Sequence, residues 1–234
     1  MSRLFIIAVL LLSPGLAFAQ SCPAPLNGAR KLVLVTADTM NSTTANVQRF
    51  ERALPSAPWI KEGDLVSALI GLKGVSWAHG FRAFARPGEP VKVDGDKRVP
   101  AGFFKIGRPF GFAPSQRPGY IRIEDGMTCV DDPASPAYNT IASRATVGLK
   151  VRGEDMWRIA LYRRGLVVEY PTNRAARAGS CIFIHVRRAA AKGTSGCVAL
   201  PEPALEALQD FTESGAVLAV LPRQALYRFR GCLP

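Results

Sequence analysis

Several patterns that define non-globular proteins are missing from this sequence. No short repeat recurs among its 234 residues, although the chain contains 21 glycines and 18 prolines, and this excludes a collagen or a coiled coil. Charged residues make up only 21% of the chain against 48% hydrophobic residues, which excludes a disordered polyampholyte. A chain of this length and composition can bury a sizeable core, and we expect one globular domain.

Long apolar runs are also lacking. The run Leu4–Leu12 is too short to cross about 30 Å of hydrocarbon, and Pro14 follows it. Arg3 precedes the run, and Ala17–Ala19 offers a small-x-small cleavage site, which together are typical of a Sec-type signal peptide. We therefore expect a signal peptide at residues 1–19, a mature domain at residues 20–234, no stable membrane span, and a location in the periplasm or cell envelope.

Acidic residues are scarce relative to basic ones, with 18 Asp and Glu against 30 Lys and Arg and a formal charge of +12. Such a surplus is common in nucleic-acid-binding proteins. The expected export, the lack of an aromatic RNA-binding signature and the lack of zinc-finger spacing argue against a nucleic-acid partner. The basic surface is expected to face anionic cell-wall polymers or simply to be solvated, and the sequence does not choose between the two.

The cysteine count is odd, which leaves one thiol unpaired in an oxidising compartment or paired between chains. Four paired cysteines allow three connectivities, and the sequence does not select one. Cys22 and Cys232 lie near the two ends of the mature chain and could join them, which would leave Cys129 with Cys181. Cys197 is the cysteine that we expect to be free.

Cys197 lies in a segment suited to a tight turn, because Gly193, Thr194, Ser195 and Gly196 precede it. Backbone N–H groups that converge in such a turn can hold an oxyanion beside an attacking thiolate.

A strand with a histidine is expected just upstream of this turn. Residues 181–186 are β-branched or aromatic for the most part, and alternation places Cys181, Phe183 and His185 on one face. His185 precedes Cys197 by 12 residues, enough for a loop and a return. The only other histidine, His79, is expected in a loop or on the surface, so His185 is the candidate partner of a catalytic thiol.

The segment 179–200 resembles the catalytic motif of the L,D-transpeptidase (YkuD-type) family, in which a His and a variable loop precede Ser or Thr, any residue, Gly and Cys. Further segments are similar to one small exported bacterial branch of that family and occur in the same order: 31–52, 95–107, 129–133 and 138–139. Three positions depart from the family pattern. Ser195 replaces a frequent His, Ala199 a frequent Arg, and Val99 the Thr of the 95–107 stretch.

The resemblance implies a cysteine acyltransferase that needs no cofactor and no metal. Cys197 would attack the diaminopimelate carbonyl of a peptidoglycan stem peptide to form a thioester, and His185 would take the thiol proton and later protonate the leaving amine. N–H groups around Gly196 and Cys197 would hold the oxyanion. Thr194 would hydrogen-bond within the loop, and Ser195 would offer its carbonyl to orient His185.

Stem peptides are therefore the expected partners, together with a protein attached to or released from the wall. Resolution of the thioester by an amine gives transpeptidation, and resolution by water gives a carboxypeptidase or amidase; the sequence does not separate the two. A third hypothesis is a non-catalytic wall-binding module that uses the basic surface. A papain-like protease is disfavoured because its Cys precedes its His.

The sequence predicts a mixed α/β, mainly β fold, which agrees with a single L,D-transpeptidase-like sheet-based catalytic domain with a few short helices. Short β-branched segments bounded by Gly or Pro predict strands at 31–36, 65–70, 120–124, 166–170, 181–186 and 216–221. Residues 203–214 are predicted to form a helix with Leu205, Leu208 and Phe211 on one face. A second helix is predicted at residues 44–53.

Overall fold

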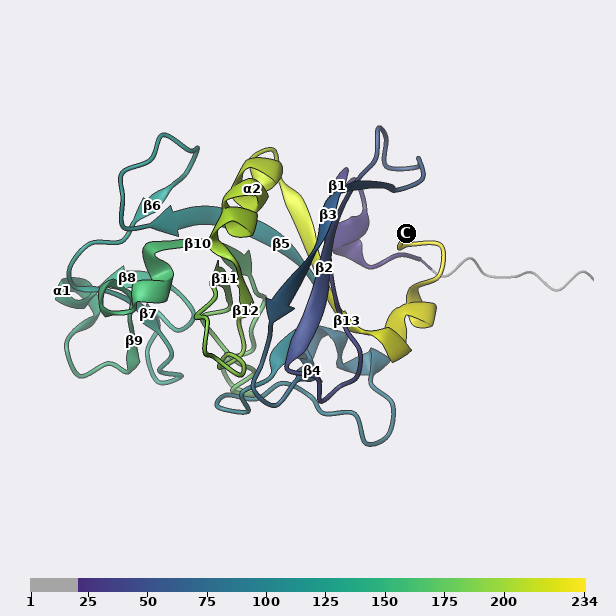
Figure 1. The fold of residues 1–234 in the computed structure, drawn as a ribbon. Coiled ribbons are helices and arrows are strands. Elements are labelled where there is room, and N and C mark those ends of the chain that lie inside the picture. Colours follow the sequence, from purple (N-terminus) through teal and green to yellow (C-terminus); the bar gives the residue numbers. More distant parts are fainter. Residues whose placement is uncertain (1–20) are drawn as a thin grey trace, which may run out of the picture.

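The computed structural model describes residues 21–234, so the expected signal peptide at residues 1–19 lies outside the described residues. The described chain is mainly β, with a few short helices (Figure 1). Its strands are β1 (Lys31–Ala37), β2 (Thr44–Glu51), β3 (Ile60–Leu69), β4 (Val75–Trp77), β5 (Val99–Gly111), β6 (Ile121–Arg122), β7 (Met127–Val130), β8 (Ile141–Ser143), β9 (Gly153–Asp155), β10 (Arg164–Glu169), β11 (Phe183–Val186), β12 (Val198–Leu200) and β13 (Ala216–Pro222).

Helical segments are short and occupy the connections between strands. The α-helices are α1 (Arg144–Val147) and α2 (Glu202–Thr212). The 3-10 segments are η1 (Ala24–Leu26), η2 (His79–Phe84), η3 (Met156–Arg158), η4 (Ala160–Arg163) and η5 (Arg223–Phe229). Within the described chain, no helix is long and apolar enough to cross a membrane.

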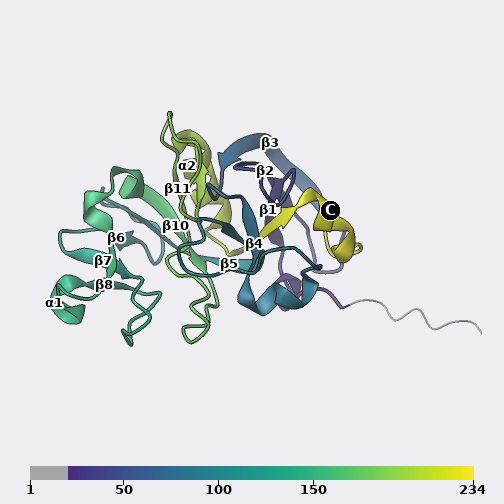
Figure 2. The same cartoon turned by 90° about the horizontal axis from the view of Figure 1, so that it is seen from below.

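The main sheet closes on itself. Its strand order is β10-β11-β12-β3-β2-β1-β13-β5, and β10 also pairs with β5, which completes the ring. β4 and β6 pair with the two ends of the long strand β5. A separate three-stranded sheet, in the order β8-β7-β9, lies at the end of the molecule opposite the C-terminus (Figures 1 and 2).

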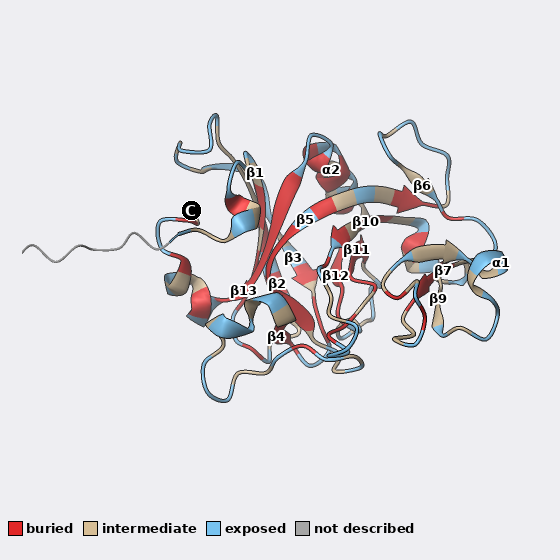
Figure 3. Cartoon of the chain, turned by 180° about the vertical axis from the view of Figure 1, so that it is seen from behind, coloured by how far each residue is buried: buried red, intermediate tan, exposed pale blue. Residues whose placement is uncertain are grey.

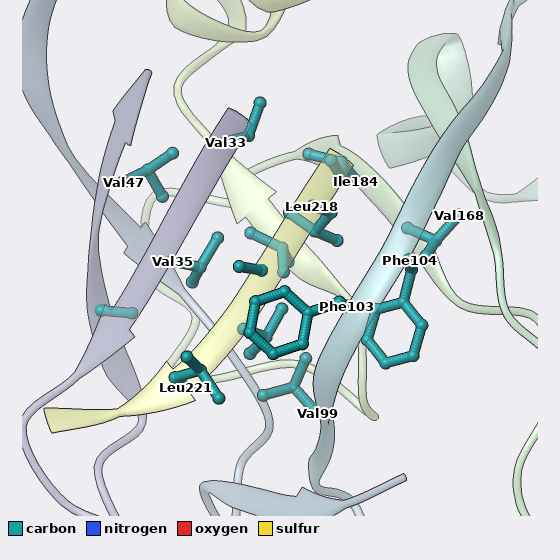
Figure 4. Close-up of a cluster of buried hydrophobic side chains, with 14 of the residues drawn as sticks. Val33, Val35, Val47, Val99, Phe103, Phe104, Val168, Ile184, Leu218 and Leu221 are labelled. Carbon is teal, nitrogen blue, oxygen red and sulfur yellow. The ribbon is translucent and has the colours of Figure 1, made fainter. Parts of the chain in front are cut away.

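The apolar core fills the inside of the main sheet. Side chains from β1, β5 and β13 converge there, including Val35, Phe103 and Leu218 (Figure 4), and β13 is buried along its whole length (Figure 3). α2 covers one side with Leu205, Leu208 and Phe211, as its apolar periodicity predicts. The strand predictions at 31–36, 65–70, 166–170, 181–186 and 216–221 agree with β1, β3, β10, β11 and β13.

Two local predictions differ from the structure. The helix predicted at residues 44–53 is wrong, because these residues form β2, which pairs with β1 and β3 on its two sides. The buried Ala45 and Val47 alternate with the exposed Thr44 and Asn46, and pairing on both edges outweighs helix propensity. The strand predicted at residues 120–124 shrinks to Ile121–Arg122.

The structure has one of the three cysteine pairings that the sequence leaves undecided. Cys22 pairs with Cys232 at a Cα–Cα distance of 5.5 Å and joins the N-terminal segment to the C-terminus. Cys129 of β7 pairs with Cys181, just before β11, so this bond links the small sheet to the main one. Cys197 is the free cysteine, as the odd count predicts.

Candidate active site

Cys197 lies at the entrance of β12, directly after a tight turn. β12 runs parallel to β11 with His185 opposite Ala199. The Thr194 hydroxyl accepts the Gly196 N–H at 3.1 Å and donates to the Cys197 carbonyl at 2.7 Å. One side chain therefore fixes both ends of the turn that presents the thiol, which agrees with the loop role expected for Thr194.

The thiol faces a pocket of about 360 Å³ between the two sheets. The turn contributes Ser195, Gly196 and Cys197 to its wall. The remaining wall carries charges of both signs: Lys92, Arg152 and Arg177 against Asp94, Asp131 and Glu154. Arg152 pairs with Asp131 at 2.9 Å, and Arg177 approaches Asp94 at 3.9 Å. The pocket therefore suits a polar ligand that carries charged groups.

The residue Cys197 is only 7% exposed. Its sulfur accepts the N–H of Phe183 at 3.4 Å and donates to the carbonyl of Cys181 at 3.6 Å. Burial raises the pKa of the thiol to about 12, and the charge of Glu154 adds to this increase, while the Phe183 N–H and Lys92 act in the opposite direction. In the ligand-free site the group is therefore a neutral thiol, which needs a base to become a nucleophile.

His185 is buried on the same face of β11 as Phe183, as strand alternation predicts. Cys181 and Phe183 belong to a second apolar cluster together with Cys197, whereas Ile182 and Ile184 point into the main core. The alternating faces of this segment thus separate the site from the core.

The His185 ring is held in one orientation. Its Nδ1 lies 2.9 Å from the Val186 carbonyl, an acceptor, so Nδ1 carries the proton and Nε2 keeps a free electron pair. Burial lowers the pKa of His185, and the bond to Val186 partly offsets this shift. Val186, and not Ser195 as expected, supplies the orienting carbonyl. In the described chain no hydrogen bond joins His185 to Cys197.

The turn offers fewer oxyanion donors than the sequence suggested. The Gly196 N–H already donates to Thr194, so it is not available to a bound oxygen in this conformation. Gly196 has a φ of +141°, and a Cβ at this position would lie 3.0 Å from the Arg98 carbonyl. Glycine is therefore required here by backbone conformation and close approach.

Sequence reasoning missed three residues beside the thiol: Lys92, Glu154 and Tyr162. Tyr162 donates a hydrogen bond to Glu154, and its ring stands edge-on to His185 at 5.5 Å between centroids. Burial raises the pKa of Glu154, although the bond from Tyr162 lowers it in part. No local motif marks these residues, because the fold brings them to Cys197 from distant segments.

Other candidates lie apart from the thiol. His79 is at the start of η2, where its Nε2 is 3.4 Å from the Asn173 amide. Within residues 21–234, no group of three or more His, Cys, Asp or Glu side chains could hold a metal ion.

Comparison of the chain with models of known protein families, with curated proteins and with solved structures finds no match. The residues of the site therefore carry the functional argument.

Proposed function

We propose that this protein is an exported cysteine acyltransferase that acts on peptidoglycan stem peptides through a thioester, as an L,D-transpeptidase does. One observation carries the proposal. Cys197 is the free cysteine, and it lies in the turn whose sequence resembles the catalytic motif of this family. It lines a charged pocket, and His185 lies on β11, the strand parallel to β12. The resemblance suggests the substrate class, and the positions of Cys197 at the pocket and of His185 on β11 support their proposed roles as nucleophile and base.

The reaction begins with a neutral Cys197 thiol and a neutral His185 ring. Nε2 of His185 accepts the thiol proton when substrate displaces the resting contacts of the sulfur, since hydrogen bonds of this kind tighten in the substrate complex. The sulfur attacks the carbonyl of the stem peptide, and His185 returns the proton to the leaving amine. A second amine then attacks the thioester and completes a crosslink.

The charged wall of the pocket supports a substrate with ionised ends. A stem peptide carries free carboxylates and an amine, and the ion-paired Arg152 and Arg177 can exchange part of their contacts for a bound carboxylate. Asp94 and Glu154 offer complementary acceptors for an ammonium group. This mixture of charges favours a zwitterionic peptide over an apolar ligand.

Hydrolysis of the same thioester is the second candidate. Glu154 favours it, because a pocket carboxyl whose pKa is raised by burial suits a general base that activates water. The two outcomes share every step up to the acyl-enzyme and differ in the acceptor.

The test uses the mature chain and its Cys197→Ala variant with tetrapeptide-rich muropeptides, followed by mass analysis. We expect a covalent adduct on wild type, and either dimeric muropeptides or products shortened by one residue. Cys197→Ala should give neither. A matched control is wild type alkylated under native conditions, since the other four cysteines are in disulfides. Equal products from all three samples would refute Cys197 as the nucleophile.

A further inference from the structure

Lys92 is a charged side chain buried in the wall of the pocket, only 4% exposed. Its backbone N–H donates to the Trp77 carbonyl at 2.8 Å, which fixes its segment along β4. Its ammonium group forms an ion pair with Asp96. An ammonium group has three N–H donors, and among the described residues the structure assigns one of them, to Asp96.

Asp96 is itself held firmly. Its carboxylate accepts the Ser76 hydroxyl at 3.0 Å and the Arg98 backbone N–H at 2.9 Å, in addition to the bond from Lys92. Burying an ion pair costs desolvation energy that the attraction between its members repays only with good geometry. The anchored carboxylate therefore fixes the position of the Lys92 ammonium beside the pocket.

The Lys92 side chain reaches the catalytic turn through a gap left by two glycines. A Cβ on Gly179 would lie 2.7 Å from Cε of Lys92, and a Cβ on Gly196 would lie 3.5 Å from its Nζ. Both glycines have positive φ, +92° and +141°, where other residues are strained. Two backbone positions thus leave room for this one cation next to Cys197.

Two features of the site favour a cation beside the turn. Glu154 disfavours a thiolate on Cys197, whereas Lys92 acts on the thiol in the opposite sense. The Gly196 N–H is bound to Thr194, so one of the N–H groups expected to hold the oxyanion is already occupied. A positive charge fixed in a low-dielectric site stabilises developing negative charge more than the same charge does in water.

We infer that Lys92 is a catalytic residue, whose ammonium group stabilises the Cys197 thiolate and then donates a hydrogen bond to the oxyanion of the tetrahedral intermediate. The role of Lys92 toward the oxyanion rests on the proposed function, whereas its role toward the thiolate does not. Asp96 is its positioning residue. The roles of both follow from the pocket geometry and not from the turn motif.

The acylation step is then complete in atoms and charge. His185 takes the thiol proton as the sulfur bonds to the carbonyl carbon, and the carbonyl electron pair moves to the oxygen, where Lys92 binds it. When the pair returns, the carbon–nitrogen bond breaks and the leaving amine takes the proton from His185. One amide and one thiol become one thioester and one amine.

The test compares wild type with Lys92→Met, the double variant Lys92→Met/Asp96→Asn and the control Lys97→Met. The double variant removes both charges of the ion pair and so avoids an unpaired carboxylate. Lys97 is exposed in the same loop and does not line the pocket. Two rates are measured on samples that retain the wild-type circular dichroism spectrum: alkylation of Cys197 as a function of pH, and thioester formation with tetrapeptide muropeptides.

Both Lys92 variants should alkylate on the order of tenfold more slowly at a given pH, because each unit of increase in the thiol pKa lowers the thiolate fraction tenfold. Thioester formation should fall on the order of 100-fold, and Lys97→Met should match wild type in both assays. Folded Lys92 variants with wild-type rates in both assays would overturn the inference. If wild type itself forms no thioester, the proposed function fails and the alkylation profile alone decides the role of Lys92.

Discussion

The sulfur of Cys197 lies against the backbone carbonyl of Cys181, at 3.6 Å. Cys181 is bonded to Cys129, and Cys129 stands opposite Glu154 in the ladder between β7 and β9. One disulfide therefore links the small sheet, which carries Glu154, to the residue whose carbonyl contacts the Cys197 sulfur. The disulfide is therefore one covalent link between the two sheets beside the thiol.

Removal of the Cys129–Cys181 disulfide should weaken both the fold and the site. The double variant Cys129→Ala/Cys181→Ala should lose about 4 kcal/mol of unfolding free energy, because the bond closes a long loop in the unfolded chain. It should also change the alkylation rate of Cys197, since Cys181 and Glu154 both shift relative to the sulfur. Denaturant unfolding and alkylation kinetics measure the two effects.

The other disulfide supplies the matched control. Cys22→Ala/Cys232→Ala should lose a similar free energy of unfolding, but its residues do not line the pocket, so Cys197 should alkylate at the wild-type rate under native conditions. Equal alkylation changes in both double variants would contradict a specific link between Cys181 and the thiol.

Thr194 should be the residue of the turn that is most sensitive to loss of a hydroxyl. Thr194→Val removes two hydrogen bonds at constant shape, to Gly196 and Cys197, and should cost about 1–3 kcal/mol of unfolding free energy. Thr194→Ser keeps the hydroxyl and should retain most of the stability. Thermal and denaturant unfolding check both variants, and identical stability of Thr194→Val and wild type would argue against this account of the turn.

An ion pair outside the pocket, in which each side chain is 9% exposed, should contribute strongly to the acid sensitivity of the fold. Glu89 binds Arg228 at 2.7 Å and accepts the indole N–H of Trp77 at 2.8 Å. The bond to Arg228 is the main reason that the pKa of Glu89 falls to about 2. Because the folded-state pKa is depressed, this stabilisation is complete above the ordinary value of 4.5 and disappears as pH falls through about 2.

At neutral pH, Glu89→Gln should be less stable than wild type by on the order of 3 kcal/mol, and the gap should close in acid. Denaturant unfolding at several pH values measures it. Asp38→Asn is the control, since Asp38 is 71% exposed in its pair with Arg223, and exposed pairs contribute little. A gap that stays constant down to the lowest pH would contradict the assignment.

Local sequence patterns predicted the strands that are rich in β-branched residues but missed the longest one. β5 spans Val99–Gly111 and contains Pro100, Gly102 and Pro109, residues that normally argue against a strand interior. Gly102 has a positive φ, and a Cβ there would lie 2.4 Å from the Phe81 ring. The glycine is needed for packing that involves a residue outside the strand, so no local rule reveals it.

The residues of the site also fall into those that local patterns predict and those that they miss. Cys197, His185 and the turn between them lie within one short stretch, so spacing and alternation predict a strand before the turn and the face that His185 shares with Phe183. Lys92 lies in the segment that pairs with β4, and Glu154 lies in β9. Only pairing between strands brings these two residues to the pocket beside the thiol. Their contribution depends on distances across the fold, which a single sequence does not encode in any local pattern.

Glu154→Gln should make Cys197 more reactive. The carboxylate of Glu154 disfavours the thiolate, so removal of its charge should lower the thiol pKa and speed alkylation several-fold at alkaline pH, where wild-type Glu154 is ionised. At acid pH, where Glu154 is protonated, the two proteins should alkylate alike. Glu124→Gln is the control, because Glu124 is 66% exposed in a turn and does not line the pocket. Slower alkylation of Glu154→Gln at alkaline pH would reverse the sign of this coupling, and thioester hydrolysis measured on the same variant would show whether Glu154 also activates water.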